Sequence, residues 1–217
     1  MIKQFIDWAE KQVCANTTIT KQRHGDQSDV FKIETAEGNY FLKISPKLEK
    51  ERERLAWLRG KLPVPEVIGF IKIGSKEALL LSSVEGKNLA ELKKEWPVEK
   101  VVDKLVNVLK KFHAVDATDC PFGNYKPGSV LVHGDACLPN FIFKEDDFSG
   151  YIDLGDMTIG NPEIDFAAAI WSLQYNFGKG YGLSFLRKCG VKNATDELVE
   201  ESRLKYEDMQ KEWGLSS

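Results

Sequence analysis

Hydrophobic residues recur every three or four positions at the start of the chain: Ile2, Phe5, Ile6, Ala9 and Val13. This spacing predicts a helix over residues 2–13. Short runs rich in β-branched and aromatic residues then predict strands at 17–20, 30–35, 40–44, 67–73 and 78–82. Residues 48–62 have a helical pattern that Pro63 and Pro65 stop. The first part of the chain is therefore expected to form a small antiparallel sheet with one long helix after its third strand.

After Gly86 the pattern becomes helical. Two helices are predicted at 89–94 and 98–113, and the second gathers six apolar residues on one face: Val101, Val102, Leu105, Val108, Leu109 and Phe112. A connector rich in Pro and Gly leads to two short apolar strands at 140–143 and 150–154. The residues from Ile164 onward have a mostly helical pattern.

Length and pattern together define the expected architecture. A chain of 217 residues can form one core or two small lobes. The change from strands to helices favours an α+β fold with two lobes joined by a short polar linker. We expect a sheet-containing N-lobe over residues 1–81, a hinge over 82–88 and a helical C-lobe over 89–217.

Composition narrows the class of protein. The contents of 42% hydrophobic and 29% charged residues are ordinary for a soluble globular protein. The first helix carries charges, so it does not resemble a signal peptide, and no apolar run approaches the roughly 18 residues that span a bilayer. The four cysteines are far apart, which disfavours a disulfide framework or a zinc site. We expect a cytoplasmic protein that does not bind a membrane.

Charge is unevenly distributed along the chain. Residues 131–217 hold 15 acidic and 8 basic side chains, a formal charge of −7, which leaves +4 for residues 1–130 within the overall −3. The acidic part would attract a cationic partner. The pI of about 5.8 and the lack of a Lys/Arg cluster near residues 133–153 disfavour a nucleic-acid partner.

A group of oxygen-bearing side chains follows a short apolar run in the second half of the chain. Residues 133–140 read HGDACLPN, and residues 150–156 read GYIDLGD. Asp135, Asn140 and Asp153 stand in the order in which kinase-type phosphotransferases place a catalytic base and two magnesium ligands. We interpret Asp135 as the acceptor of a hydroxyl proton and the other two as ligands of Mg²⁺. The alternative, that all three only satisfy backbone donors in turns, is disfavoured for three such residues on one hairpin.

Lys43 is the candidate for a cation that contacts phosphates, because it lies in the strand YFLKI between apolar neighbours. Alternation places Phe41 on the same face of that strand, where it would cover an adenine. A buried lysine needs a carboxylate partner. We predict Glu51, which shares a helix face with three leucines, whereas Glu49 and Glu53 belong to more polar faces.

Two further segments are candidates for nucleotide contacts. Residues 24–28, HGDQS, lie between two strands and would cap the phosphates with Ser28 and backbone amides, although an ordinary hairpin loop is the simpler interpretation. The backbone at Ser82 and Val84 ends the sheet at the expected hinge. It would read an adenine edge if the kinase hypothesis holds.

Three carboxylates are candidates for the acceptor site: Asp156, which ends the second motif, and Glu163 and Asp165, which follow it. Asp165 follows a proline at a helix start, so N-capping is its simplest role. His133 is interpreted as a brace of the catalytic loop, and Cys137 as a packing residue.

The motifs HGDACLPN and GYIDLGD resemble the signature of the aminoglycoside phosphotransferase family, especially the kanamycin and neomycin 3′-phosphotransferases. The stretches LLLSSVEG, WLRGKLPVPEV and FHAVDATDCPF are also similar, so the resemblance covers essentially the whole chain. It implies a bilobal, protein-kinase-like fold that uses ATP (or GTP) and Mg²⁺, with the site roles assigned above. Gly134 stands where protein kinases have Arg, and no activation loop ending in APE follows. A small-molecule acceptor is therefore expected rather than a protein.

The chain differs from the antibiotic-modifying members in ways that bear on the acceptor. Only residues 123–132 fill the gap before HGD, where those members carry a helical excursion, and Asp156 stands where they commonly have Arg. The acidic C-lobe favours an aminoglycoside-type acceptor, and another hydroxylated metabolite, such as an amino alcohol or a sugar, is the alternative. A nucleotide-binding pseudokinase is disfavoured because Lys43, Asp135, Asn140 and Asp153 are all present.

Overall fold

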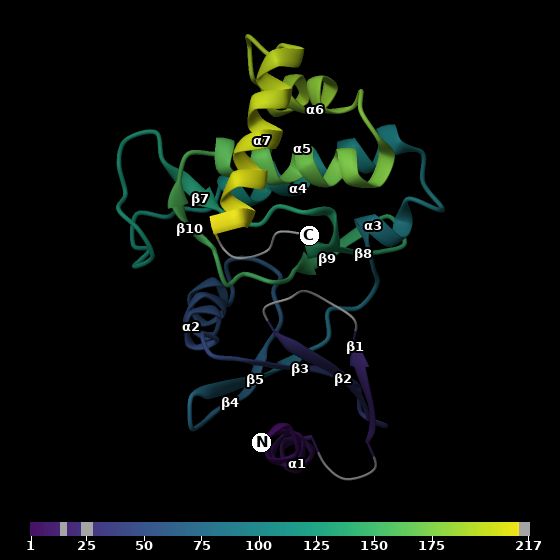
Figure 1. Ribbon diagram of the computed structural model, residues 1–217, viewed down its shortest axis with the longest axis vertical. Helices are drawn as coiled ribbons and strands as arrows, with labels where there is room; N and C mark the ends of the chain where they lie inside the picture. Colours follow the sequence, from purple (N-terminus) through teal and green to yellow (C-terminus); the bar gives the residue numbers. More distant parts are fainter. Residues whose placement is uncertain (14–16, 23–27, 213–217) are drawn as a thin grey trace. The chain divides into compact units, whose positions relative to one another are not determined.

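The chain divides into two units in the computed structural model, which describes residues 1–13, 17–22 and 28–212 (Figure 1). The N-terminal unit comprises Met1–Val84, and the C-terminal unit comprises Glu85–Ser217. The division falls within residues 82–88. Whether this segment acts as a hinge stays a prediction.

Five antiparallel strands form the sheet of the N-terminal unit, in the spatial order β1-β2-β3-β5-β4. Their bounds are β1 Thr18–Gln22, β2 Asp29–Glu34, β3 Asn39–Ser45, β4 Val67–Ile73 and β5 Lys76–Ser82. The central strand β3 pairs with β2 and β5, so that Lys43 lies opposite Val30 on one side and Leu79 on the other. The sheet therefore fixes the backbone of Lys43 from both sides.

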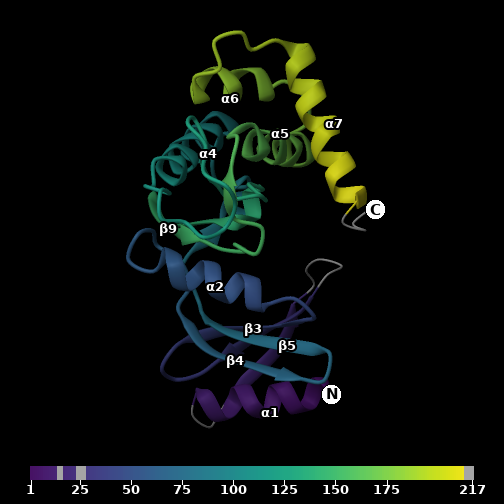
Figure 2. The same ribbon diagram turned by 90° about the vertical axis from the view of Figure 1, so that its left-hand side faces the viewer.

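Two helices cover opposite faces of this sheet, α1 (Ile2–Gln12) and α2 (Glu49–Leu58) (Figure 2). Phe5 and Ala9 of α1 pack with Leu42 and Ile44 of β3 in one buried cluster. Because side chains alternate along a strand, Lys43 points to the other face, on the side of α2. The amphipathic pattern of β3 thus separates a core face from a face that carries a charge.

Helix α2 is shorter than the sequence predicts. It ends at Leu58, because Arg59 leaves the helical region with φ −55° and ψ 123°, and Gly60 has a φ of +79°. Glycine adopts this left-handed conformation without the strain that a side chain would add, and it commonly ends a helix. The two prolines that were expected to stop the helix lie beyond this point.

Helices and two small sheets form the C-terminal unit. Its elements are β6 Lys87–Asn88, α3 Leu89–Leu92, α4 Val98–His113, β7 Val130–Val132, η1 Leu138–Asn140, β8 Phe141–Lys144, β9 Asp147–Tyr151, β10 Thr158–Gly160, α5 Glu163–Phe177, α6 Gly182–Cys189 and α7 Asp196–Glu212. One sheet has the order β6-β8-β9, and the other pairs β10 with β7. All six apolar residues predicted for one face of α4 are buried, and Tyr151 of β9 donates its hydroxyl hydrogen bond to the carbonyl of Val108 at 2.8 Å.

The strand that was expected to contain Asp153 ends at Tyr151. Asp153 has a φ of +58°, in the left-handed region, which an extended strand residue does not adopt. Asn140 also lies outside a strand, since it closes the 3₁₀ turn η1 before β8 begins. Both predicted metal ligands therefore lie in turns next to strand ends. The alternation of side chains between the two faces of a sheet does not fix their orientation there.

Within the described residues, no helix is long and apolar enough to cross a membrane.

Candidate active site

Lys43 and Glu51 form an ion pair in the N-terminal unit. The Nζ atom of Lys43 lies 2.7 Å from Oε1 and 3.0 Å from Oε2 of Glu51. The side chain of Glu51 is only 5% exposed, and that of Lys43 is 14% exposed. Both charges are largely removed from water, so the loss of either partner would leave an uncompensated charge. The structure brings these two residues together, and the contact of Lys43 with phosphates stays a prediction.

Glu77 of β5 holds the start of the helix that carries Glu51. Its Oε2 atom accepts hydrogen bonds from the amides of Leu48 at 2.6 Å and Glu49 at 2.9 Å, and Lys72 reaches Oε1 at 3.1 Å. Burial alone would raise the pKa of Glu77, but the amides of Glu49 and Leu48 and the ammonium of Lys72 outweigh it and lower this pKa. A carboxylate at a helix N-terminus also interacts favourably with the helix dipole. Sequence reasoning missed this residue, which carries the only charge in the strand interior EALLLS.

Asp135 and Asn140 contact each other directly in the loop between β7 and β8. The Nδ2 atom of Asn140 donates to Oδ2 of Asp135 at 2.9 Å and to the Asp135 carbonyl at 2.8 Å. The amide nitrogen of Asn140 is therefore turned toward Asp135, and its oxygen Oδ1 is directed away from that carboxylate. A neutral amide oxygen in this orientation is a suitable ligand for a hard cation.

The second carboxylate oxygen of Asp135 accepts a hydrogen bond from a residue that sequence reasoning did not single out. The hydroxyl of Tyr206, in α7, lies 2.6 Å from Oδ1 of Asp135. Tyr206 stands 71 residues after Asp135 in a helix whose pattern is mostly charged. Nothing in that pattern distinguishes it from an ordinary core tyrosine.

Helix α5 supports the backbone of the same loop. Asp165 accepts hydrogen bonds from the amides of His133 and Gly134, both at 2.9 Å, and from Nε2 of His113 at 2.8 Å. About two turns further along α5, the hydroxyl of Ser172 accepts from the amide of Leu138 at 3.0 Å. The loop is thus anchored at its beginning and near its end by one helix.

The predicted roles of Asp165 are wrong. Its side chain is fully buried, makes no cap to its own helix, and uses both oxygens to hold the loop between β7 and β8. A carboxylate without exposed surface cannot contact an acceptor. Asp156 and Glu163 are exposed, and their contact with an acceptor stays a prediction.

His133 contacts the loop and the segment after β9. Its Nδ1 atom accepts from the amide of Asp135 at 3.4 Å, and its Nε2 atom lies 3.1 Å from the carbonyl of Ile152. In these contacts Nδ1 is the acceptor, and Nε2 is placed to donate to the Ile152 carbonyl. The geometry agrees with the interpretation of His133 as a brace of the loop.

Asp153 lies next to the segment that contains Asn140. The amide of Ile152 donates to the Asn140 carbonyl at 3.0 Å, which ties the two turns together one residue before Asp153. Asp153 is exposed. In the described part of the chain, no three His, Cys, Asp or Glu residues are grouped so as to hold a metal ion alone. One amide oxygen and one carboxylate nevertheless fit Mg²⁺, which usually takes one or two carboxylates and completes its shell with phosphate oxygens and water.

The remaining nucleotide candidates lie in the N-terminal unit. Phe41 is half-buried on β3, and Ser28 lies just before β2, while residues 24–27 are outside the described residues. The amide of Ser82 donates to the carbonyl of Glu66 at 2.9 Å, and its hydroxyl accepts from the Glu66 amide at 2.8 Å. The amide of Ser82 is therefore already engaged at the margin of the sheet. The contact of the backbone at Ser82 and Val84 with an adenine edge stays a prediction.

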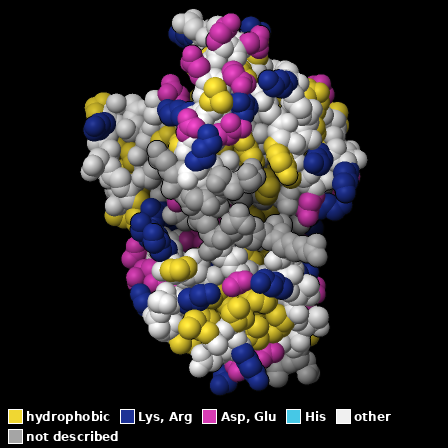
Figure 3. All heavy atoms as spheres, viewed as in Figure 1, with side chains coloured by type: hydrophobic (Ala, Val, Ile, Leu, Met, Phe, Trp, Pro, Cys, Tyr) yellow, Lys and Arg dark blue, Asp and Glu magenta, His cyan; other side chains and the backbone are white. Residues whose placement is uncertain are grey.

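On the face of the C-terminal unit that Figure 3 shows, charged side chains of both signs are mixed. On α7, Arg203 pairs with Glu200 and Glu207, and Lys211 pairs with Asp208. Part of the negative charge of this half of the chain is therefore offset within its own last helix.

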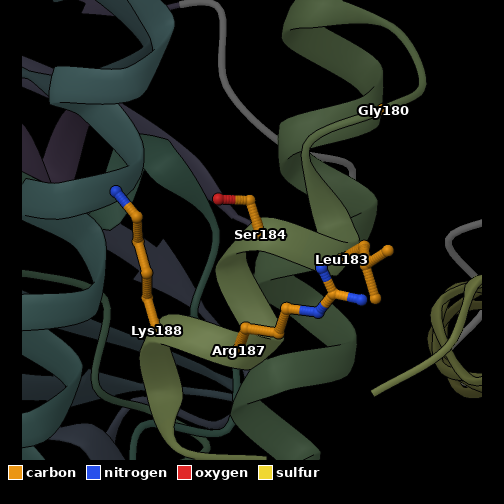
Figure 4. Close-up of a pocket in the computed structure, with 5 residues that line it drawn as sticks. All are labelled: Gly180, Leu183, Ser184, Arg187 and Lys188. Carbon is orange, nitrogen blue, oxygen red and sulfur yellow. The ribbon is translucent and has the colours of Figure 1, made fainter.

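A pocket of about 480 Å³ lies along α6 and is lined by Gly180, Leu183, Ser184, Arg187 and Lys188 (Figure 4). The side chains of Arg187 and Lys188 extend from the helix in different directions, and Lys188 forms an ion pair with Asp103 of α4. None of the lining residues is a predicted site residue.

Comparison with known proteins identifies a family, curated relatives and solved structures that this chain resembles. The model of the phosphotransferase enzyme family matches residues 19–128 and 125–198. The aminoglycoside 3′-phosphotransferase of Niallia circulans is 26% identical, over 89% of this chain and 94% of that protein. That of Enterococcus faecalis is 25% identical, over 82% and 89% of the two chains.

The solved structures agree with the sequence relatives. An aminoglycoside 3′-phosphotransferase of type VIII matches with a TM-score of 0.74 and 19% identity, over 94% of this chain and 98% of that one. An aminoglycoside phosphotransferase from Streptomyces rimosus, in complex with ADP and streptomycin, matches with a TM-score of 0.72 and 21% identity, over 95% and 97%. These similarities confirm the predicted α+β, bilobal kinase-like fold class. The two matched ranges of the family model overlap at residues 125–128. This overlap lies in the connector over residues 114–129, which contains no helix.

Proposed function

The chain belongs to the phosphotransferase enzyme family, and from this premise we propose that it transfers the γ-phosphoryl group of ATP to a hydroxyl of an aminoglycoside-type acceptor. The observation that carries this proposal is the hydrogen-bonded pair of Asp135 and Asn140 in a loop held by α5. Phosphoryl transfer depends mainly on positioning and on charge stabilisation, and a loop anchored in this way supplies the positioning.

In the proposed mechanism, Asp135 orients the acceptor hydroxyl and takes its proton as the oxygen attacks the γ-phosphorus. Lys43, oriented by Glu51, supplies positive charge for the phosphate oxygens. Asn140 and Asp153 would hold Mg²⁺, which when bound offsets the charge of the phosphates. Phe41 and the backbone at Val84 would contact the adenine.

Two observations support an aminoglycoside as the acceptor. The curated relatives are aminoglycoside 3′-phosphotransferases, and one structural neighbour binds streptomycin together with ADP. The formal charge of −7 on residues 131–217 favours a polycationic molecule, with Asp156 and Glu163 as exposed carboxylates for its amino groups. The use of ATP also favours the cytoplasm as the location of the enzyme, since that compartment holds the nucleotide.

A second candidate acceptor is another small hydroxylated metabolite. It is favoured by the helix-free connector over residues 114–129, because the helical excursion of the antibiotic-modifying members helps to wall the acceptor pocket. The catalytic residues would be the same for both acceptors.

A coupled ADP-release assay with ATP and Mg²⁺ tests the proposal. The panel contains kanamycin, neomycin, choline and simple sugars, and the Asp135→Ala variant serves as the control for contaminating activity. We expect turnover that depends on the aminoglycosides. Turnover with choline or a sugar alone would favour the second candidate, and magnesium-dependent nucleotide binding without turnover would contradict both.

A further inference from the structure

Tyr206 makes a direct contact with the predicted catalytic base. Its hydroxyl donates to Oδ1 of Asp135 at 2.6 Å, while Asn140 donates to Oδ2 at 2.9 Å. We propose that Tyr206 is a positioning residue, which fixes the plane of the Asp135 carboxylate for an acceptor hydroxyl and keeps water from Oδ1. This inference rests on the proposed function.

The surroundings of Tyr206 keep its hydroxyl a permanent donor. The side chain is 2% exposed, its ring lies 5.6 Å from that of Trp171, and its oxygen lies 3.4 Å from Sγ of Cys137. Burial raises the pKa of Tyr206 far above its usual value, and the neighbouring Cys137 and Asp135 raise it further. The phenol therefore stays protonated over the whole working range of pH.

Two helices divide the support of the catalytic loop between them. Helix α5 binds the backbone of the loop through Asp165 and Ser172, and α7 binds the carboxylate through Tyr206. Helix α7 packs against α5, which carries Trp171 (Figures 1 and 2). The position of Tyr206 is thus set by the same helix that sets the loop.

A carboxylate has about four positions at which it can accept a hydrogen bond, so Tyr206 and Asn140 leave room for an acceptor hydroxyl on half-buried Asp135. In the transfer step, the acceptor oxygen bonds to the γ-phosphorus and its proton moves to Asp135. The bond from that phosphorus to the bridging oxygen breaks, and the nucleoside diphosphate leaves with the electron pair. Without the Tyr206 hydroxyl, the carboxylate would be free to rotate, and water would compete for Oδ1.

The Tyr206→Phe variant tests this role, because it keeps the ring against Trp171 and removes only the hydroxyl. The matched control is Tyr175→Phe, since Tyr175 stacks on the same Trp171 at 5.3 Å but is 77% exposed. We expect kcat for transfer to fall about 10- to 100-fold in Tyr206→Phe, the usual effect of a hydrogen bond to a charged group. We also expect KM for ATP to stay within about twofold, and the ratio of acceptor-independent ATP hydrolysis to transfer to rise; the control should match the wild type. An unchanged kcat, or equal losses of transfer and hydrolysis, would overturn the proposal.

Thermal unfolding tests the contact without using activity. Tyr206→Phe should lower the melting temperature of the wild-type chain and have little effect in an Asp135→Ala background, because the partner is then absent. Additive shifts, in an enzyme that does transfer phosphate, would overturn the role of Tyr206. Non-additive shifts in a protein that phosphorylates no acceptor would instead contradict the proposed function.

Discussion

At Gly134 the chain has no room for a side chain. Its φ is +87°, and an added Cβ would lie 2.4 Å from the carbonyl oxygen of Asp156. Gly128 has almost the same φ, +88°, with nothing within 4 Å of the added atom. Both glycines need a left-handed backbone, but only Gly134 also needs the absence of a Cβ, because another segment approaches it closely.

We predict that Gly134→Ala lowers both stability and phosphotransfer more than Gly128→Ala does. The control should cost about 1–2 kcal/mol, the strain of a left-handed alanine. Gly134→Ala adds a clash that only a shift of the catalytic loop or of Asp156 can relieve. Urea unfolding and kcat measurements compare the two variants, and equal losses would show that the close approach is unimportant.

The Lys43–Glu51 pair gives a second prediction for single residues. Glu51→Gln keeps the size of the side chain but removes the charge that orients Lys43, so KM for ATP should rise about tenfold or more. Glu53→Gln, on an exposed position of the same helix, is the control and should leave KM unchanged. Steady-state kinetics at varied ATP concentration distinguish the two variants. A similar KM for ATP in both would contradict the assignment of Lys43 to the nucleotide site.

At the scale of elements, the carboxylate of Glu77 joins the start of helix α2 to the sheet. Glu77 of β5 accepts the amides of Leu48 and Glu49 at the start of this helix, and the helix carries Glu51 to Lys43. The position of the ion pair thus depends on a cap that comes from another element.

We predict that Glu77→Gln destabilises the chain by about 1–3 kcal/mol at neutral pH, since it weakens the hydrogen bonds to the buried amide of Leu48 and the partly buried amide of Glu49. The pKa of Glu77 is lowered in the folded state, so its contribution is present above the ordinary value of 4.5 and is lost as the pH falls through the lower, folded-state pKa. The stability difference between wild type and variant should therefore shrink on acidification. Urea unfolding at several pH values measures it, and a difference that grows toward acid pH would contradict the assignment.

Elements with strong local patterns could be predicted from the sequence. The bounds of α4 and β4 match the predictions because their apolar spacing is unambiguous. The prediction of a strand through Asp153 was wrong, because nothing in the apolar run YIDL indicates that Asp153 has a left-handed backbone conformation. Tyr206 could not be predicted, since its contact with Asp135 depends on how α7 packs and not on any nearby residue. Asp165 was interpreted as a helix cap because it lies near a helix start. The amides that it binds, those of His133 and Gly134, are 32 and 31 residues away in the sequence, so the sequence does not indicate this contact.

At the scale of the whole molecule, charge is the property most relevant to the acceptor. The first 130 residues carry +4 and the remainder −7. An acidic acceptor site attracts a polycation at long range, and salt screens that attraction, with a Debye length of about 10 Å at 0.1 M.

We predict that KM for an aminoglycoside rises with ionic strength more steeply than KM for an uncharged sugar, because only the first is attracted by carboxylates. Asp156→Asn should raise KM for the aminoglycoside further, and Asp208→Asn, which alters a charge on α7 paired with Lys211, is the control. Initial rates between low and moderate salt give both constants. A KM for the aminoglycoside that does not depend on salt would argue against a cationic acceptor.

The most direct test of the central claim is transfer of radiolabelled γ-phosphate from ATP to an aminoglycoside by wild type and Asp135→Asn. We expect the variant to bind the nucleotide with unchanged affinity but to transfer phosphate at least about 100-fold more slowly, the lower end of the effect of a positioned acid–base group. The one side-chain oxygen of the substituted residue can still accept from Tyr206, and Asn140 keeps its hydrogen bond to the backbone carbonyl of residue 135, so the fold should persist. Transfer at the wild-type rate by the folded variant would contradict the assignment of Asp135 as the catalytic base.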